Sequence, residues 1–178
     1  MIQSVRQTNW CVITGAPCSG KTAVIDELER RGFNVIHEVA RAYIDEQLTK
    51  GLQLNQIKAD ELRFERHILH EKVRIETSLS TNATVFFDRG LPDSIAYFKL
   101  AGIDSTEPLK KSGYHRYKHV FFFERFDFSK DQVRSENEAT AVKLDFLIYE
   151  SYRMLGYDLV PVPKLPIPKR ADFILKHL

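Results

Sequence analysis

The sequence is poor in cysteine, in net charge and in long apolar runs. Only Cys11 and Cys18 are cysteines, and neither belongs to a Cys-x-x-Cys pair, so disulfides do not hold this fold together and a reducing compartment is expected. A net charge of +2 gives no bulk attraction to nucleic acid or to anionic lipid. No apolar run approaches the roughly 20 residues of a membrane span, and the N-terminus lacks the apolar core of a signal peptide. These absences predict a cytoplasmic protein with no nucleic-acid partner and no membrane span.

What is present has the balance of an ordinary globular protein. Hydrophobic residues make up 43% and charged residues 28% of the 178 positions, a composition that can bury a sizeable core. No repeat, low-complexity tract or Pro/Gly/Ser-rich linker divides the chain. We therefore expect one domain over residues 1–178, whose oligomeric state the sequence leaves open.

Strand patterns alternate with helix patterns along the chain. Short apolar runs rich in β-branched or aromatic residues predict strands that are buried on both faces. These runs are Cys11–Thr14, Phe33–Ile36, Thr84–Phe87, Val120–Phe123 and Asp158–Val162. Helical patterns cover Lys21–Arg31, Glu38–Lys50, Asn55–Leu79, Pro92–Leu100, Glu136–Leu155 and Ile167–Leu178. The alternation predicts a three-layer α/β fold with a parallel sheet and helices on both faces. A ligand should then bind beyond the carboxyl ends of the strands.

The longest of these helical patterns is Asn55–Leu79, which predicts a single amphipathic helix. Its apolar stripe consists of Ile57, Leu62, Ile68, Leu69, Val73 and Ile75.

A phosphate-binding motif follows the first strand. The loop consists of Gly15, Ala16, Pro17, Cys18, Ser19, Gly20, Lys21 and Thr22, and it matches G-x-x-x-x-G-K-[ST] at every fixed position. In such a loop backbone N–H groups surround phosphate oxygens, the lysine reaches the β- and γ-phosphates, and the hydroxyl ligates Mg²⁺. A match of this length also arises by chance in tight turns. Here a strand precedes it and a helix follows it, so we predict a site for ATP and Mg²⁺.

A second motif, "TVFFDRG" at residues 84–90, narrows the class of phosphate-loop protein. Asp88 ends a predicted strand, where an aspartate can hold Mg²⁺ directly or through water. Arg89 stands where motor ATPases usually carry a glutamate, and no N-K-x-D or D-x-x-G motif of a GTPase occurs. A salt bridge at the strand end is the alternative role for Asp88 and Arg89.

Three further residues are candidates for the same edge of the sheet. Glu38 follows a predicted strand and suits a general base or a water-bridged Mg²⁺ contact, although an acid there is also favoured by the helix dipole. Arg41 lies one helical turn further and can pair with Glu38, bind an anionic acceptor or remain solvated. Asp93 is either a first-turn helix acid or an acceptor contact.

Four stretches together resemble a known family. They are "GAPCSGKT", "GFNVIHEVARAYIDEQ", "FFDRGLPDSIAYFKLAGI" and "LGYDLVPVPKLPIPKRADFIL". In this order they are similar to the AAA-type P-loop kinase-like NTPase family, with its G-x-P-x-x-G-K-T, E-x-A-R and D-R-G-x-x-D boxes. Nicotinamide-riboside kinase domains are neighbours of that family, and deoxynucleoside and thymidylate kinases are more distant ones. The resemblance covers nearly the whole chain and implies a kinase-type sheet of strand order 2-3-1-4-5.

The resemblance also implies roles for particular residues. Glu38 would act on the acceptor hydroxyl. Independently of the resemblance, we count Arg41, Arg89 and Asp93 as candidate acceptor contacts. Residues 124–138 would form a lid over the triphosphate, and Arg134 matches the family's lid arginine. The loop after the last strand would border the adenine.

We therefore predict transfer of the γ-phosphoryl group from ATP to a small acceptor such as a nucleoside or nucleotide. Lys21 would stabilise the phosphates, Thr22 and Asp88 would hold Mg²⁺, Glu38 would orient or deprotonate the acceptor, and Arg134 would neutralise developing charge. An NTPase whose acceptor is water and a nucleotide-dependent binding switch are the alternatives. The sequence does not name the acceptor.

Overall fold

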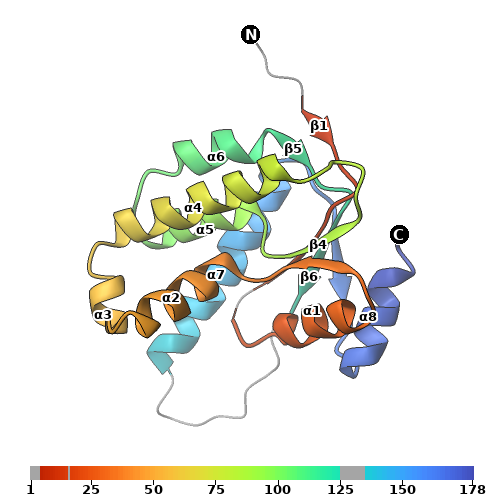
Figure 1. Ribbon diagram of the computed structural model, residues 1–178, viewed down its shortest axis with the longest axis horizontal. Helices are drawn as coiled ribbons and strands as arrows, with labels where there is room; N and C mark the ends of the chain where they lie inside the picture. Colours follow the sequence, from red (N-terminus) through yellow and green to blue (C-terminus); the bar gives the residue numbers. More distant parts are fainter. Residues whose placement is uncertain (1–4, 16, 125–134) are drawn as a thin grey trace.

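A five-stranded parallel sheet forms the centre of the computed structural model (Figure 1). The structure describes residues 5–15, 17–124 and 135–178, without the side chains of residues 135–138. The strands are β2 (Cys11–Thr14), β3 (Asn34–Ile36), β4 (Val85–Asp88), β6 (His119–Phe123) and β7 (Leu159–Val162). Their spatial order is β3-β4-β2-β6-β7, with every neighbouring pair parallel. Counted along the chain this is order 2-3-1-4-5, so the predicted topology is confirmed.

Helices cover both faces of this sheet, as the three-layer prediction requires (Figure 1). The helices are α1 (Lys21–Arg30), α2 (Val39–Thr49), α3 (Leu54–Ile57), α4 (Glu61–Ser78), α5 (Leu91–Leu100), α6 (Thr106–Ser112), α7 (Ser135–Met154) and α8 (Ile167–Leu175). Helices α1 and α8 pack on one face. Helices α4, α5 and α7 pack on the other.

The central strands are apolar without interruption because their side chains enter two separate cores. Val12 and Phe87 point into the core shared with α5 and α7. Their chain neighbours Cys11, Ile13 and Phe86 point into the core shared with α1 and α8. Side chains of a strand alternate between faces, so a strand covered on both sides needs an apolar residue at every position.

The predicted single helix over Asn55–Leu79 is wrong. The chain forms α3 and α4 instead, and α4 begins because the Asp60 side chain accepts a hydrogen bond of 2.9 Å from the backbone N–H of Arg63. A cap of this kind favours a new helix start over continuation. The proposed stripe is shifted accordingly: Leu62 is 40% exposed, whereas Phe64 is buried.

Three small elements lack a sequence signal. The strands β1 (Arg6–Gln7) and β5 (His115–Arg116) form a separate parallel pair of two residues each, too short to show periodicity. Helix α6 has only seven residues and carries Pro108 in its first turn. Because β1 precedes β2 and β5 precedes β6, the pair lies at the amino ends of the central strands, away from the phosphate loop.

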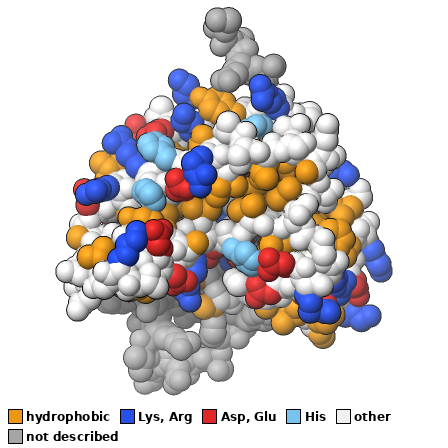
Figure 2. Space-filling model, in the orientation of Figure 1, with side chains coloured by type: hydrophobic (Ala, Val, Ile, Leu, Met, Phe, Trp, Pro, Cys, Tyr) orange, Lys and Arg blue, Asp and Glu red, His pale blue; other side chains and the backbone are white. Residues whose placement is uncertain are grey.

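The surface carries charges of both signs. On the face shown in Figure 2, basic and acidic side chains are interspersed, with hydrophobic side chains between them. Among the described helices, none combines the length and the apolarity that crossing a bilayer requires.

Candidate functional site

The phosphate loop connects β2 to α1 and depends on glycine at its first position. Gly15 has a φ of 129°, and a Cβ there would lie 2.3 Å from the carbonyl oxygen of Phe123. Only glycine fits such a position. Gly20, with a φ of 83°, directly precedes Lys21, the first residue of α1. The first-turn N–H groups and the positive dipole end of α1 therefore border the loop, as an anion site requires. Ala16 lies outside the described residues.

Lys21 is held in a buried position at the end of this loop. It is 5% exposed, and its Nζ donates to Ser19 Oγ at 3.2 Å. Burial, assisted by the nearby Arg89 charge, lowers the pKa of Lys21 to about 8. A buried ammonium group is stabilised by an anion placed beside it, which is what a bound phosphate supplies.

Asp88 ends β4 next to the phosphate loop. Thr22 Oγ1 donates to Asp88 Oδ2 at 3.3 Å. Asp88 is 1% exposed, and its Oδ1 has no hydrogen-bond partner among the described residues. Burial, followed by the neighbouring Glu38 charge, raises the pKa of Asp88. A buried carboxylate oxygen without a partner, beside a hydroxyl, fits a Mg²⁺ ion bound between protein and phosphates.

Arg89 is buried and joins three parts of the site. Its backbone adopts a φ of 70°, a left-handed conformation that is uncommon outside glycine. The guanidinium donates to Gly15 O at 2.9 Å, to Glu38 Oε1 at 3.2 Å and to Asp93 Oδ1 at 3.1 Å. Arg89 therefore forms ion pairs with Glu38 and with Asp93. Among the described residues, the structure shows no ion pair between Arg89 and Asp88.

Asp93, in the first turn of α5, is fully buried. Burial alone would raise the pKa of its carboxyl, but the charges of Arg89 and Lys72 lower it below its usual value. Four donors surround the carboxylate: Thr14 Oγ1 at 2.6 Å, Arg89 Nη1 at 3.1 Å, Gly90 N at 3.0 Å and Tyr152 OH at 2.6 Å. These contacts fit a positioning role for Asp93 at the start of the helix rather than an acceptor contact.

Glu38 and Arg41 take different directions. Glu38 precedes α2, yet its side chain makes no cap hydrogen bond and contacts Arg89 instead, with 30% of the side chain exposed. Arg41 is 77% exposed and pairs with Asp45 at 3.4 Å on its own helix. The carboxylate of Glu38 therefore faces the phosphate loop, and the proposed pairing of Arg41 with Glu38 is not formed.

A cavity of about 350 Å³ lies beside Glu38 and Arg89. It also touches Pro17 of the phosphate loop, so it adjoins that loop. Its apolar walls are Ile44, Phe64, Ile68, Leu100 and Leu144, and its inner polar groups are Glu65, Lys72, Ser94 and Tyr97. We call this space the acceptor pocket.

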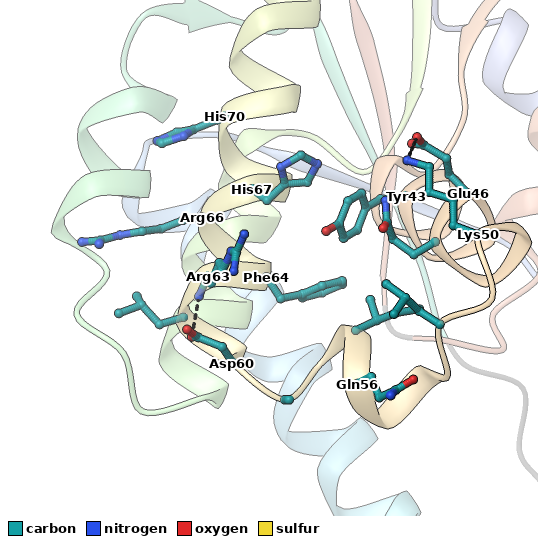
Figure 3. Close-up of a pocket in the computed structure, with 15 residues that line it drawn as sticks. Tyr43, Glu46, Lys50, Gln56, Asp60, Arg63, Phe64, Arg66, His67 and His70 are labelled. Carbon is teal, nitrogen blue, oxygen red and sulfur yellow. Dashed lines mark hydrogen bonds and ion pairs between the residues drawn. The ribbon is translucent and has the colours of Figure 1, made fainter.

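A larger cavity of about 1050 Å³ lies between α2 and α4 and is distinct from the phosphate loop (Figure 3). Tyr43 and His67 approach one another there from the two helices, with ring centroids 4.1 Å apart. Phe64 lines both this cavity and the acceptor pocket. No described residue of the phosphate loop lines the larger cavity, whereas Pro17 of that loop lines the smaller one.

A third hollow, of about 660 Å³, lies between the start of α1 and the loop after β7. Arg170 borders it and is buried, donating to Ser19 O at 3.1 Å and to Leu165 O at 2.7 Å. This links the last loop to the phosphate loop. Arg170 is absent from our sequence predictions. The sequence does contain one signal for Arg170. It is a positively charged residue near the N-terminus of α8, where the helix dipole disfavours positive charge.

Comparison with known families identifies the chain. Residues 10–170 match a family described as an AAA domain. The chain belongs to this family. Among curated protein sequences, none matches it.

Several solved structures share the fold of this AAA-domain protein. The NadR protein in complex with NR has a TM-score of 0.69 and 16% identity, over 96% of this chain and 50% of that one. Deoxyadenosine kinase from M. mycoides has a TM-score of 0.63 and 19% identity, over 94% and 96% of the two chains. Thymidylate kinase from Ehrlichia chaffeensis has a TM-score of 0.65 and 14% identity, over 96% and 98%. The AAA-domain chain thus spans half of the NadR chain and nearly the whole of each kinase.

The structure brings most of the predicted residues to one sheet edge. Short contacts join Thr22 to Asp88 and Glu38 to Arg89 there. The charges of Asp88, Glu38 and Arg89 also act on the pKa of Lys21. Arg134 and the rest of residues 125–134 lie outside the described part of the chain, so the lid stays a prediction. The sequence analysis also missed Glu65, Lys72 and Tyr152, which come from helices distant in sequence and belong to no motif.

Proposed function

We propose that this AAA-domain protein transfers the γ-phosphoryl group of ATP to a hydroxyl of a small molecule in the acceptor pocket. The observation that carries the proposal is the position of Glu38. Its carboxylate lies in the wall of a ligand-sized cavity that also contacts the phosphate loop. An enzyme whose acceptor is water needs no such cavity.

The residues of the phosphate loop would position the donor. Lys21 and the N–H groups at the start of α1 would bind the β- and γ-phosphates, and Thr22 and Asp88 would hold Mg²⁺. The ion, when bound, neutralises charge on the phosphates. A cation beside Asp88 would oppose the burial that raises the pKa of this carboxyl.

Glu38 would receive the proton in the transfer step. The acceptor oxygen forms a bond to the γ-phosphorus, while the bond from that phosphorus to the bridging oxygen of ADP breaks. The acceptor proton passes to the Glu38 carboxylate. Arg89 holds that carboxylate through one oxygen, Oε1, which leaves Oε2 for the acceptor. Arg134, within the proposed lid of residues 124–138, would neutralise charge on the transferring group.

Structures with this fold indicate which acceptors to test first. One is the NadR protein in complex with NR, one is a deoxyadenosine kinase with dCMP and dCDP bound, and one is a thymidylate kinase. Nucleosides and nucleotides are therefore the first compounds for a screen on this protein.

The test is a transfer assay with radiolabelled γ-phosphate against nucleosides and nucleotides. Glu38→Gln keeps the shape but removes the base, so transfer should fall about a hundredfold while ATP affinity stays nearly unchanged. Asp88→Asn should instead raise the Mg²⁺ concentration that activity requires. Glu46→Gln is a matched control, since Glu46 is exposed on α2 and pairs only with Lys50.

Two outcomes contradict this proposal. Brisk ATP hydrolysis without an acceptor, unaffected by Glu38→Gln, would replace the kinase with an NTPase. Tight nucleotide binding with neither transfer nor hydrolysis would favour a binding switch.

A further inference from the structure

Glu65 is a carboxyl group of the acceptor pocket for which the proposed reaction has no use. It lies on α4 and is half-buried in the pocket wall beside Phe64 and Ile68. Among the described residues, none forms a hydrogen bond or an ion pair with Glu65. Burial raises the pKa of Glu65 to about 7. A polar group that is held in a cavity wall without a partner is poised to bind a ligand.

The two buried cations of the pocket are occupied by the protein itself. Arg89 donates to three acceptors, and its side chain is only 3% exposed. Lys72 is buried and donates to Gly90 O at 3.0 Å and to Ser94 Oγ at 3.4 Å. Burial lowers the pKa of Lys72, and the charge of Asp93 opposes that shift.

The other cations of the lining lie at its rim. Arg41 is paired with Asp45, and Lys58 lies 5.4 Å from the centroid of the Phe64 ring. Strong binding of a phosphate group needs donors that are buried and directed at its oxygens. In the described lining, the buried cationic donors already bind acceptors of the protein, and the carboxylates of Glu38 and Glu65 face the ligand beside the neutral hydroxyls of Ser94 and Tyr97.

We propose that the acceptor is an unphosphorylated, nucleoside-class molecule whose N–H donor group binds Glu65 while its hydroxyl faces Glu38. This inference rests on the proposed function. The pocket of about 350 Å³ lies at the lower end of ligand-site volumes, which suits one small molecule. Phe64, Ile68 and Tyr97 provide flat and apolar surface for a ring. A monophosphate would instead bring two negative charges toward two carboxylates, while the buried cations Lys72 and Arg89 already donate to acceptors of the protein.

The first experiment compares matched pairs of acceptors. The common ribo- and deoxyribonucleosides and their 5′-monophosphates are tested as acceptors of radiolabelled γ-phosphate. We expect at least one nucleoside to exceed its own monophosphate by more than about tenfold in kcat/KM, a difference of about 1.4 kcal/mol.

The second experiment tests Glu65 with the best acceptor. Glu65→Gln keeps the size but replaces a charged acceptor of hydrogen bonds with a neutral one, so KM should rise about tenfold with little change in kcat. Glu71→Gln, on the same helix but paired with Arg74 and outside the pocket, is the matched control and should leave KM unchanged.

The pH profile separates a ligand contact from a structural role. The carboxylate form of Glu65 grows as pH rises through about 7, so KM should fall over that range and Glu65→Gln should abolish the dependence. The charged or titratable groups around Glu65 are Lys58, Glu61, Lys72 and Tyr97, together with Glu38, Arg41 and Arg89 in the same pocket. Burial lowers the pKa of Lys72 and raises that of Tyr97 to about 12, so the loss of the pH dependence in Glu65→Gln is the result that assigns it to Glu65.

The outcomes separate this inference from the function on which it rests. Preferred transfer to a monophosphate, or a Glu65→Gln variant with unchanged KM and pH profile, overturns the inference and leaves a kinase. Hydrolysis of ATP without transfer to any of the nucleosides or their monophosphates overturns the proposed function. Calorimetry that detects no nucleoside binding, with and without Mg²⁺–ATP, overturns the inference alone.

Discussion

The phosphate end and the acceptor end of this site are built in different ways. At the phosphate end, consecutive residues 15–22 form the site, and the geometry is set by backbone conformation and by the contact at Gly15. At the acceptor end, single side chains arrive from separate elements: Glu38 before α2, Glu65 on α4, Arg89 after β4 and Tyr97 on α5. A site built from the backbone of one loop can be specified by a single sequence motif. A site built from side chains of several elements depends on how all the helices pack.

Arg89 connects the two ends. It binds Gly15 O at the phosphate end, Glu38 at the acceptor end and Asp93 in the core. The connection fixes the distance between the loop and the proposed base, which transfer chemistry requires. Perturbing Arg89 should therefore affect both ends, whereas other substitutions should affect only one.

The largest expected effect follows from Arg89→Met. Asp93 would lose its buried ion pair while keeping three other donors. We therefore expect a loss near the lower end of the usual range for breaking a buried pair, about 3 kcal/mol in the free energy of unfolding. Urea denaturation measures it. Arg41→Met removes an exposed pair and should cost less than about 0.5 kcal/mol. Equal losses for the two variants would contradict the connecting role of Arg89.

A smaller effect, confined to the phosphate end, follows from Lys21→Ala. Loss of a charged hydrogen-bonding group should weaken Mg²⁺–ATP binding about a hundredfold. The fold and the binding of acceptor alone should be unchanged, since Lys21 does not line the acceptor pocket. Calorimetry with each ligand, together with circular dichroism, tests this. If the parent protein and the Lys21→Ala variant are both folded and bind ATP with equal affinity, Lys21 does not belong to the nucleotide site.

The sequence predicted the phosphate end more fully than the acceptor end, because consecutive residues form the phosphate end and residues from separate elements form the acceptor end. The loop motif, the strand before it and the order of the strands each show as a local pattern or as a family box. Glu38, Asp88 and Arg89 stand in such boxes, and the structure places them at one edge of the sheet.

Contacts between helices distant in sequence gave no comparable signal. Tyr152 reaches Asp93 across 59 positions, and Arg170 reaches Ser19 across 151. The break between α3 and α4 was missed because apolar spacing continues across it, although Asp60 carried a cap signal. The pairing of Arg41 depends on a rotamer choice between Glu38 and Asp45, which periodicity cannot decide.

The protein should discriminate only weakly between the bases of ATP and GTP. The hollow between α1 and the loop after β7 is lined by Gly20, Ala23, residues 164–168 and Arg170, and this lining contains no carboxylate to read guanine. We expect ATP to bind at least as well as GTP. A competition titration measures the ratio. A preference for GTP beyond about tenfold, or about 1.4 kcal/mol, would contradict the predicted nucleotide and favour a switch.

The smallest expected effect uses the two cysteines as probes of the phosphate end. Cys18 is exposed in the loop, whereas Cys11 is buried in β2, and burial raises the pKa of Cys11 to about 12. Iodoacetamide at pH 8 should therefore alkylate Cys18 and spare Cys11, because the thiolate is the reactive form. Saturating Mg²⁺–ATP should slow the reaction of Cys18 severalfold by covering the loop. Mass spectrometry of the modified peptides gives both rates. Lys21→Ala should abolish the protection at the same ATP concentration, and an unchanged rate in the parent protein would place the nucleotide away from this loop.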